Sequence, residues 1–191
     1  PNRVEIVDIE VGDPGPGEYL VAISKSAISP GTELRCLAGK QAGSPPWPFI
    51  PGYAACGKIL KAGKDVTLRE GQRVYCHLEP LRTSIKSCWG RHLGHAVFAE
   101  SALLSLPDAL DDVSASGLKL AAVGYHGMRV SGVQPHEKVA LIGLGVIGQF
   151  AARAYQLVGC DVVASDRNPR RTALAKNVGI PVTACDATDL P

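Results

Sequence analysis

The sequence predicts an α/β protein in which a small, irregular β domain is followed by the first part of a doubly wound parallel sheet. Up to about residue 110, short β-like runs alternate with clusters of Pro and Gly, and from Asp111 the apolar residues follow helical spacing. The stretch KVALIGLGVIGQFAARAYQLVGCDVVASD, Lys138 to Asp166, is typical of a strand, a tight turn, a helix and a second strand. The predicted domains are residues 1–119 and 120–191.

The elements of the first domain are predicted from β-forming residues bounded by turn residues. The candidate strands are Val4 to Ile9, Tyr19 to Ser24, Gly57 to Lys61, Arg73 to His77 and Ala96 to Glu100. Helical spacing predicts one helix from Val113 to Val130 that leads into the second domain.

The turn after the strand Lys138 to Ile142 contains Gly143, Gly145 and Gly148, with the spacing G-x-G-x-x-G. In a strand–turn–helix unit the first glycine permits the turn, the second lets the backbone approach a pyrophosphate, and the third lets helix and strand pack closely. The N–H groups at the start of the helix favour the phosphate charge. These glycines, with Val146 and Ile147 between them, are therefore predicted to bind a dinucleotide.

Asp166 follows the second buried strand, Val162 to Ala164, about twenty residues beyond the glycines, where an acid accepts hydrogen bonds from the ribose hydroxyls of the cofactor. A carboxylate there repels a 2′-phosphate, so NAD is favoured over NADP. Arg167, the predicted neighbour of the ribose, argues mildly for NADP, as do Arg170 and Arg171. The preferred interpretation is that Arg170 and Arg171 face solvent in a helix capped by Asn168, with Pro169 at its first position.

After Asp166 the sequence predicts only one helix, Pro169 to Val178, and a third strand around Val182 to Cys185. A doubly wound dinucleotide domain has about six parallel strands. We therefore expect the sheet to be truncated within this chain.

The composition excludes several classes of function. The 191 residues are 46% hydrophobic and 20% charged, with a net charge of +2 and no basic run, so no nucleic-acid partner is predicted. No apolar run has the length of a membrane span, and no signal peptide is visible, so no membrane partner is expected. The six cysteines are scattered, which favours reduced thiols and a cytoplasmic location.

Segments along nearly the whole chain resemble the medium-chain dehydrogenase/reductase superfamily. They are Pro14-Gly15-Pro16-Gly17-Glu18, Pro51-Gly52-Tyr53, Glu70-Gly71-Gln72-Arg73-Val74, Phe98-Ala99-Glu100, Leu106-Pro107-Asp108, Gly124-Tyr125 and the glycine turn. The resemblance implies a GroES-like domain followed by a Rossmann domain, a nicotinamide cofactor and a small-molecule substrate. It also implies a homodimer for the full-length protein.

Three positions depart from the zinc-dependent members of the superfamily. Where those members carry ligands in a C-G-T-D-like segment, in a G-H-E segment and shortly before the Gly-Tyr pair, this sequence has Pro30, Tyr53 and Lys119. Catalytic zinc takes three protein ligands with N, S or O donors. No catalytic zinc is therefore predicted. Two cysteines, Cys76 and Cys88, stand where the structural zinc lobe requires four.

With zinc absent, Tyr53 is predicted to donate or accept the proton of the substrate oxygen. Lys119 would favour the phenolate of Tyr53 or polarise the carbonyl directly, and Thr32 would complete the proton relay, as its position in the superfamily implies. In the alternative reading, Tyr53 packs its ring under the cofactor and Lys119 pairs with a carboxylate such as Glu33.

The sequence thus predicts a zinc-independent oxidoreductase that transfers hydride between NAD(H) and a carbonyl or secondary alcohol. Ser29-Pro30-Gly31-Thr32-Glu33 resembles the bacteriochlorophyllide a dehydrogenase-like branch, which implies specialised biosynthesis and a bulky alcohol. Two alternatives stay open. One is a quinone or enone reductase that uses NADPH, and the other is a non-catalytic dinucleotide-binding module.

Overall fold

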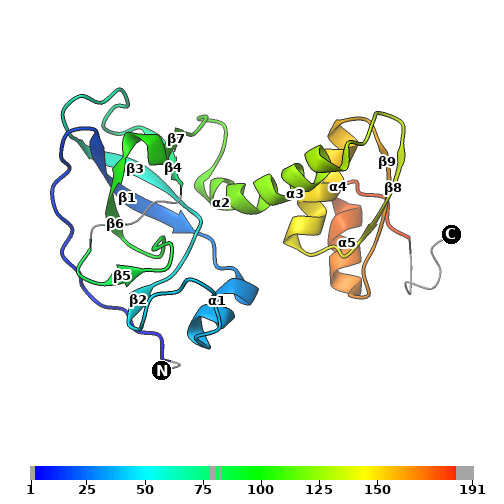
Figure 1. Cartoon of the computed structure of the whole chain (residues 1–191). Coiled ribbons are helices and arrows are strands. Elements are labelled where there is room, and N and C mark those ends of the chain that lie inside the picture. The colour runs from blue at the N-terminus through cyan, green and yellow to red at the C-terminus, as the bar shows by residue number, and fades with distance from the viewer. Residues whose placement is uncertain (1–2, 78–80, 82, 184–191) are drawn as a thin grey trace. The chain divides into compact units, whose positions relative to one another are not determined.

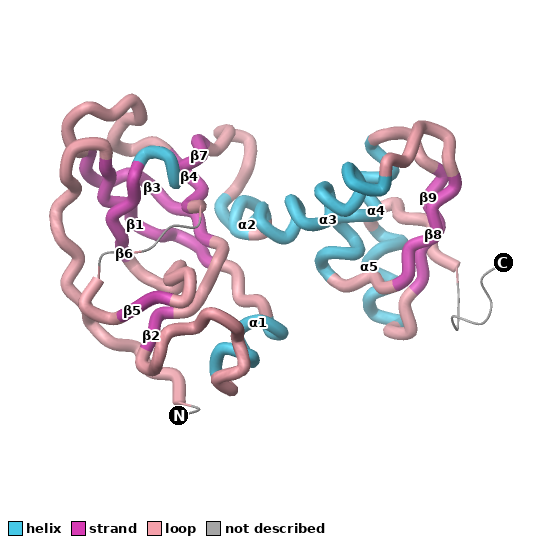
Figure 2. Tube along the Cα trace, viewed as in Figure 1, coloured by secondary structure: helices cyan, strands magenta, loops and turns pink. Residues whose placement is uncertain are grey.

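The computed structural model describes residues 3–77, 81 and 83–183 (Figure 1). The chain divides into two compact units, Pro1–Leu118 and Lys119–Pro191. The first unit is mainly β and the second contains a parallel strand pair and helices (Figure 2). Within the part of the chain that is described, no helix is both long enough and apolar enough to cross a membrane.

A five-stranded antiparallel sheet with the strand order β6-β1-β3-β4-β7 forms the first unit. Its strands are β1 (Glu18–Ser26), β3 (Ala55–Ala62), β4 (Arg73–Cys76), β6 (His95–Ala99) and β7 (Leu103–Ser105). A short parallel pair, β2 (Phe49–Ile50) and β5 (Lys86–Ser87), lies outside this sheet. The helices of this unit are α1 (Pro30–Leu37), the 3₁₀ turn η1 (Glu100–Ala102) and α2 (Asp112–Ser116).

Four of the five predicted strands are confirmed within two residues at each end, and the fifth is wrong. Val4 to Ile9 forms no strand, and Val4 and Ile6 are 82% and 102% exposed. A strand is stabilised by pairing and by a buried face, and this segment has neither. β-forming residues without a partner strand therefore did not produce a strand here.

The core of the first unit contains the inward-facing residues of the sheet. Tyr19, Val21, Ile59, Val74 and Phe98 are each at most 1% exposed and pack in one cluster. Tyr19 and Val21 lie on one face because alternate residues of a strand point to the same side.

Two buried tyrosines differ in how their hydroxyls are satisfied. Tyr19 Oη accepts a hydrogen bond from the backbone N–H of Leu68 at 2.7 Å. The hydroxyl of Tyr75 has no partner among the described residues, and burial raises its pKa to about 12. Tyr19 therefore stabilises the fold through its hydroxyl, whereas Tyr75 contributes through its ring.

We expect Tyr19→Phe to lower the free energy of unfolding by about 1–2 kcal/mol, because the Leu68 N–H loses its partner. Tyr75→Phe removes a buried hydroxyl without a partner and should leave stability unchanged or slightly raised. Urea unfolding of both variants and the parent measures the difference. A larger loss for Tyr75→Phe than for Tyr19→Phe would contradict this assignment.

An ion-pair network joins the start of α2 to the sheet. The Asp112 carboxylate accepts hydrogen bonds from Ser24 Oγ at 2.5 Å and from Arg73 Nε and Nη2 at 3.0 and 2.5 Å. Arg73 also donates to the carbonyl of Leu110. The bond from Ser24, followed by those from Arg73, holds the pKa of Asp112 below its ordinary value.

A carboxyl group whose pKa is lowered by folding stabilises the protein above its unfolded pKa of about 4. This contribution is lost as the pH falls through the lower pKa of the folded state. Asp112→Asn should therefore cost about 1–3 kcal/mol at pH 7 and make unfolding less sensitive to acid below pH 4. Urea unfolding between pH 3 and 7 tests this, with the exposed Asp108→Asn as the control. Equal acid sensitivity in the parent and Asp112→Asn would exclude the network as a source of acid lability.

The second unit contains α3 (Leu118–Ser131), β8 (Lys138–Ile142), α4 (Val146–Leu157), β9 (Asp161–Ser165) and α5 (Pro169–Asn177). β8 and β9 pair in parallel along all five residues. Val182 adds a parallel bridge to Ala164, at the start of the predicted third strand. The end of that predicted strand, at Cys185, lies outside the described residues.

The single helix predicted from Val113 to Val130 is two helices, α2 and α3. The side chain of Asp111 caps the start of α2 by accepting from the N–H of Ser114 at 2.9 Å, and Gly117 ends the helix. Gly117 keeps φ of −79°, within the helical region, and α3 begins at the next residue, so helical periodicity alone does not reveal the break.

Helices α3 and α4 approach each other closely at Gly124. A Cβ atom on Gly124 would lie 2.7 Å from the backbone nitrogen of Ala151 and 3.1 Å from the carbonyl oxygen of Ile147. The small residue allows the helix that precedes β8 to pack against the helix that follows it.

Candidate functional site

The turn between β8 and α4 has the geometry that its three glycines predict. Gly143 has φ of +99°, a conformation that side chains disfavour. A Cβ on Gly148 would lie 1.9 Å from the carbonyl oxygen of Gly143, whereas one on Gly145 would meet nothing within 4 Å. The first and third glycines are therefore needed for the turn and its packing, and the second leaves open space beside the start of α4.

Asp166 follows β9 and its carboxylate bonds to the glycine turn. Oδ2 accepts from the backbone N–H of Leu144 at 2.8 Å and lies 3.4 Å from Arg171 Nη1, while Oδ1 accepts from the N–H of Asn168 at 2.7 Å. The bonds from Asn168 and Leu144 are the main reasons that the pKa of Asp166 lies below its ordinary value. Asp166 is thus ionised, and its hydrogen bond from Leu144 also links the turn to the residue that follows β9.

A surface depression of about 580 Å³ lies beside Asp166 and the start of α5. It is lined by Asp166, Arg167, Asn168, Pro169 and Arg171. The predicted cap of α5 is confirmed, because Asn168 Oδ1 accepts from the N–H of Arg170 at 2.9 Å and Pro169 follows it. The residues predicted to surround the ribose therefore share one depression.

The predicted catalytic residues occupy three segments. Thr32 lies in the first turn of α1, where its hydroxyl accepts from Ser29 Oγ at 3.2 Å, and Pro30 begins this helix. Tyr53 follows β2, and its ring makes an edge contact with Trp89 at a centroid distance of 5.9 Å. Lys119 is half-buried near the start of α3, in the second unit, so its role beside Tyr53 stays a prediction.

His92 connects the segments that carry Thr32 and Tyr53, which the sequence analysis did not predict. Its Nδ1 lies 2.9 Å from Ser26 Oγ, and its Nε2 lies 3.1 Å from Glu33 Oε1. The ring packs on Gly52, where a Cβ would come within 2.8 Å of it. These residues are separated by up to 66 positions in the chain and form no motif, so only the folded chain brings them together.

The loop that carries His92 is held by backbone bonds and a buried arginine. Cys88 and His92 donate their N–H groups to the carbonyls of Ile50 and Pro51 at 2.8 and 3.1 Å. Arg91 is fully buried, donates to the carbonyl of Trp89 at 2.6 Å and lies over the ring of Phe98 at 4.9 Å. His92 and Trp89 are therefore positioned by the fold.

We expect His92→Phe to lower the free energy of unfolding by about 1–3 kcal/mol, because Ser26 and the mostly buried Glu33 carboxylate lose their partner. His95→Phe, at an exposed position three residues later, is the matched control. Urea unfolding compares the two. Equal stability of both variants would mean that the Ser26–His92–Glu33 contacts contribute little to the fold.

The resemblance assigns Pro30, Tyr53 and Lys119 to the positions of the superfamily's zinc ligands, and this assignment stays a prediction. A proline side chain has no donor atom, so Pro30 itself cannot bind a metal ion. Among the residues that the structure describes, no group of three or more His, Cys, Asp or Glu side chains could hold a metal ion. The five described cysteines are buried free thiols, and burial raises the pKa of Cys36 to about 11.

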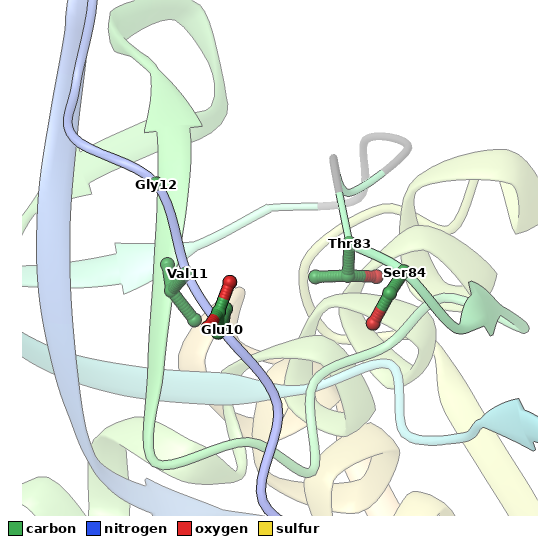
Figure 3. Close-up of a pocket in the computed structure, with 5 residues that line it drawn as sticks. All are labelled: Glu10, Val11, Gly12, Thr83 and Ser84. Atoms are coloured by element: carbon green, nitrogen blue, oxygen red, sulfur yellow. The ribbon is translucent and has the colours of Figure 1, made fainter.

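A larger surface depression, of about 700 Å³, lies in the first unit (Figure 3). Glu10, Val11 and Gly12 of the N-terminal segment line one side of it, and Thr83 and Ser84 line the other. Among the described residues that line it, Glu10 alone has an ionisable side chain, and none of the predicted site residues belongs to this lining.

Comparison with known proteins identifies the family. Residues 15–110 match the alcohol dehydrogenase GroES-like domain, so the chain belongs to this family and to the medium-chain dehydrogenase/reductase superfamily. It is 31% identical to an alcohol dehydrogenase of Rhizobium meliloti (strain 1021) over 91% of this chain and 57% of that protein. It is 28% identical to a 2-desacetyl-2-hydroxyethyl bacteriochlorophyllide A dehydrogenase of Cereibacter sphaeroides over 80% of this chain and 49% of that protein.

A solved structure shares the same fold. A dehydrogenase of the zinc-binding type from Sinorhizobium meliloti 1021, bound to NADP, superposes with a TM-score of 0.77 at 25% identity. The match covers 93% of this chain and 57% of that one. The chain thus spans about half the length of the relatives that it matches, and the predicted GroES-like and Rossmann folds are confirmed.

Proposed function

We propose that this chain belongs to a zinc-independent oxidoreductase that transfers hydride between a nicotinamide dinucleotide and a carbonyl or secondary alcohol. The proposal is supported by the geometry of the glycine turn, together with Pro30, Tyr53 and Lys119 at the positions that the resemblance assigns to the metal ligands. The dehydrogenases among its relatives support the class of reaction. The bacteriochlorophyllide dehydrogenase supports a bulky alcohol in specialised biosynthesis.

The residues of the second unit fit the dinucleotide. The open space beside Gly145 leaves room for a pyrophosphate against the start of α4, where N–H groups point outward. The ribose would lie by Asp166 and Arg167. NAD is the cofactor that Asp166 favours. When bound, the cofactor supplies or accepts the hydride.

Because the cofactor supplies or accepts the hydride, the protein's side chains need to transfer only a proton. When a carbonyl is reduced, hydride reaches its carbon and the Tyr53 phenol protonates its oxygen, so that an alcohol and a phenolate form. In this proposal the ammonium of Lys119 would stabilise that phenolate, and Thr32 would relay a proton back to it from solvent. Alcohol oxidation runs through the same groups in reverse.

The test is cofactor turnover by the purified protein, with a chelator present throughout. NAD and NADP are compared against matched panels of secondary alcohols and enones. We expect alcohol oxidation that is indifferent to the chelator. Turnover of enones alone with NADPH would replace the proposal with an enone reductase. Tight cofactor binding without turnover would favour a non-catalytic dinucleotide-binding module.

A further inference from the structure

The carboxylate that would exclude a 2′-phosphate is largely engaged by the chain itself. Three donors reach Asp166: the N–H groups of Leu144 and Asn168, and Arg171 Nη1 at 3.4 Å. Its side chain is only 8% exposed. A carboxylate has about four acceptor positions, so one remains for a ribose hydroxyl. NAD can therefore still bind, but little of the negative charge faces the depression.

The lining of the depression beside this carboxylate includes two arginines. Arg167 and Arg171 both border it, and the Arg171 side chain is 54% exposed. Arg171 presents five N–H donors and directs one of them at Asp166. A phosphate monoester carries a charge of about −1.5 to −2 near neutral pH and pairs well with the planar donor set of arginine. The lining thus places more positive than negative charge next to the expected ribose.

We infer that this site accepts the 2′-phosphate of NADP as well as the free hydroxyl of NAD, and that Arg171 is the residue that determines this dual specificity. The inference rests on the proposed nicotinamide cofactor and extends it to the 2′-phosphorylated form. The ion pair holds Arg171 beside Asp166, so its remaining donors are available to a phosphate without a rearrangement of the turn. Arg167 borders the same depression and adds a second positive charge.

The experiment measures binding rather than turnover. Dissociation constants for NAD, NADP, 5′-AMP and adenosine 2′,5′-bisphosphate are determined by calorimetry at one fixed salt concentration. For the parent protein we expect NAD and NADP to bind within about tenfold of each other, and the bisphosphate to bind more tightly than 5′-AMP. Arg171→Gln should weaken NADP at least tenfold and change NAD less than threefold. Arg170→Gln, next to it but outside the lining, should change neither.

Two results would overturn the inference. One is an NADP affinity more than 100-fold below that of NAD in the parent protein, and the other is an equal effect of Arg171→Gln and Arg170→Gln on NADP. If Arg171→Gln abolishes NAD binding as well as NADP binding, the Arg171→Lys variant is measured in the same way. Loss of NADP alone by this variant, which lacks the planar donor set of arginine, supports the inference, as does binding of NADP through the retained charge. Equal loss of NAD and NADP contradicts it. Failure of the parent to bind either cofactor would instead reject the proposed function.

Discussion

Gly148→Ala is expected to unfold much of the second unit and to abolish dinucleotide binding. Its Cβ would lie 1.9 Å from the carbonyl oxygen of Gly143 and 3.0 Å from the carbonyl carbon, and both are backbone atoms of the residue that follows β8. Relief of this clash requires α4 to move away from the strand that it covers. We expect a loss of about 3 kcal/mol or more, since overpacking against backbone is poorly accommodated. Thermal unfolding by circular dichroism and calorimetric titration with NAD measure the two effects.

Gly145→Ala in the same turn is the matched control. Gly145 has φ of −64°, which alanine also adopts, and its Cβ would meet no atom within 4 Å. Stability should therefore change by less than about 0.5 kcal/mol. Cofactor affinity should fall strongly, because the added methyl group occupies the approach of the pyrophosphate. Unchanged NAD affinity in Gly145→Ala would show that the dinucleotide does not lie against this turn.

Tyr53→Phe is expected to lower turnover by about 10² to 10⁴-fold with no change in folding. The substitution removes only the hydroxyl, and a phenylalanine ring can keep the edge contact with Trp89. Steady-state rates at saturating cofactor measure the effect, together with a melting curve for stability. Tyr125→Phe, at an exposed position in α3, is the control.

The comparison of Tyr53→Phe with its control separates catalysis from packing. Full turnover by Tyr53→Phe would remove the proton-transfer role and leave the alternative in which the ring only packs against the cofactor. If Tyr53→Phe lowers the melting temperature enough to unfold the protein under the assay conditions, the loss of turnover would likewise be assigned to packing. Lys119→Met extends the test, because loss of the ammonium should reduce turnover if it stabilises the phenolate.

The pattern of residues within a segment was sufficient to predict its secondary structure where that structure depends only on residues close in the sequence. Lys138–Ile142 was predicted as a strand with the same bounds that β8 has, and Asn168 and Pro169 were predicted at the start of α5. Val4 to Ile9 was wrong because a strand requires a distant partner, and the chain offers it none among the described residues. The helix break at Gly117 was missed because apolar periodicity continues across it.

The sequence by itself determined the superfamily and the glycine turn, since both depend on residue identity at short spacing, and it predicts the substitutions at the zinc-ligand positions. The tertiary structure decided how far the charge of Asp166 is engaged by Leu144, Asn168 and Arg171. It also brought Ser26, Glu33 and His92 together from distant segments. The physical reason is that hydrogen bonds and charge compensation depend on distances of a few ångströms, which the folded backbone sets between residues that the sequence separates.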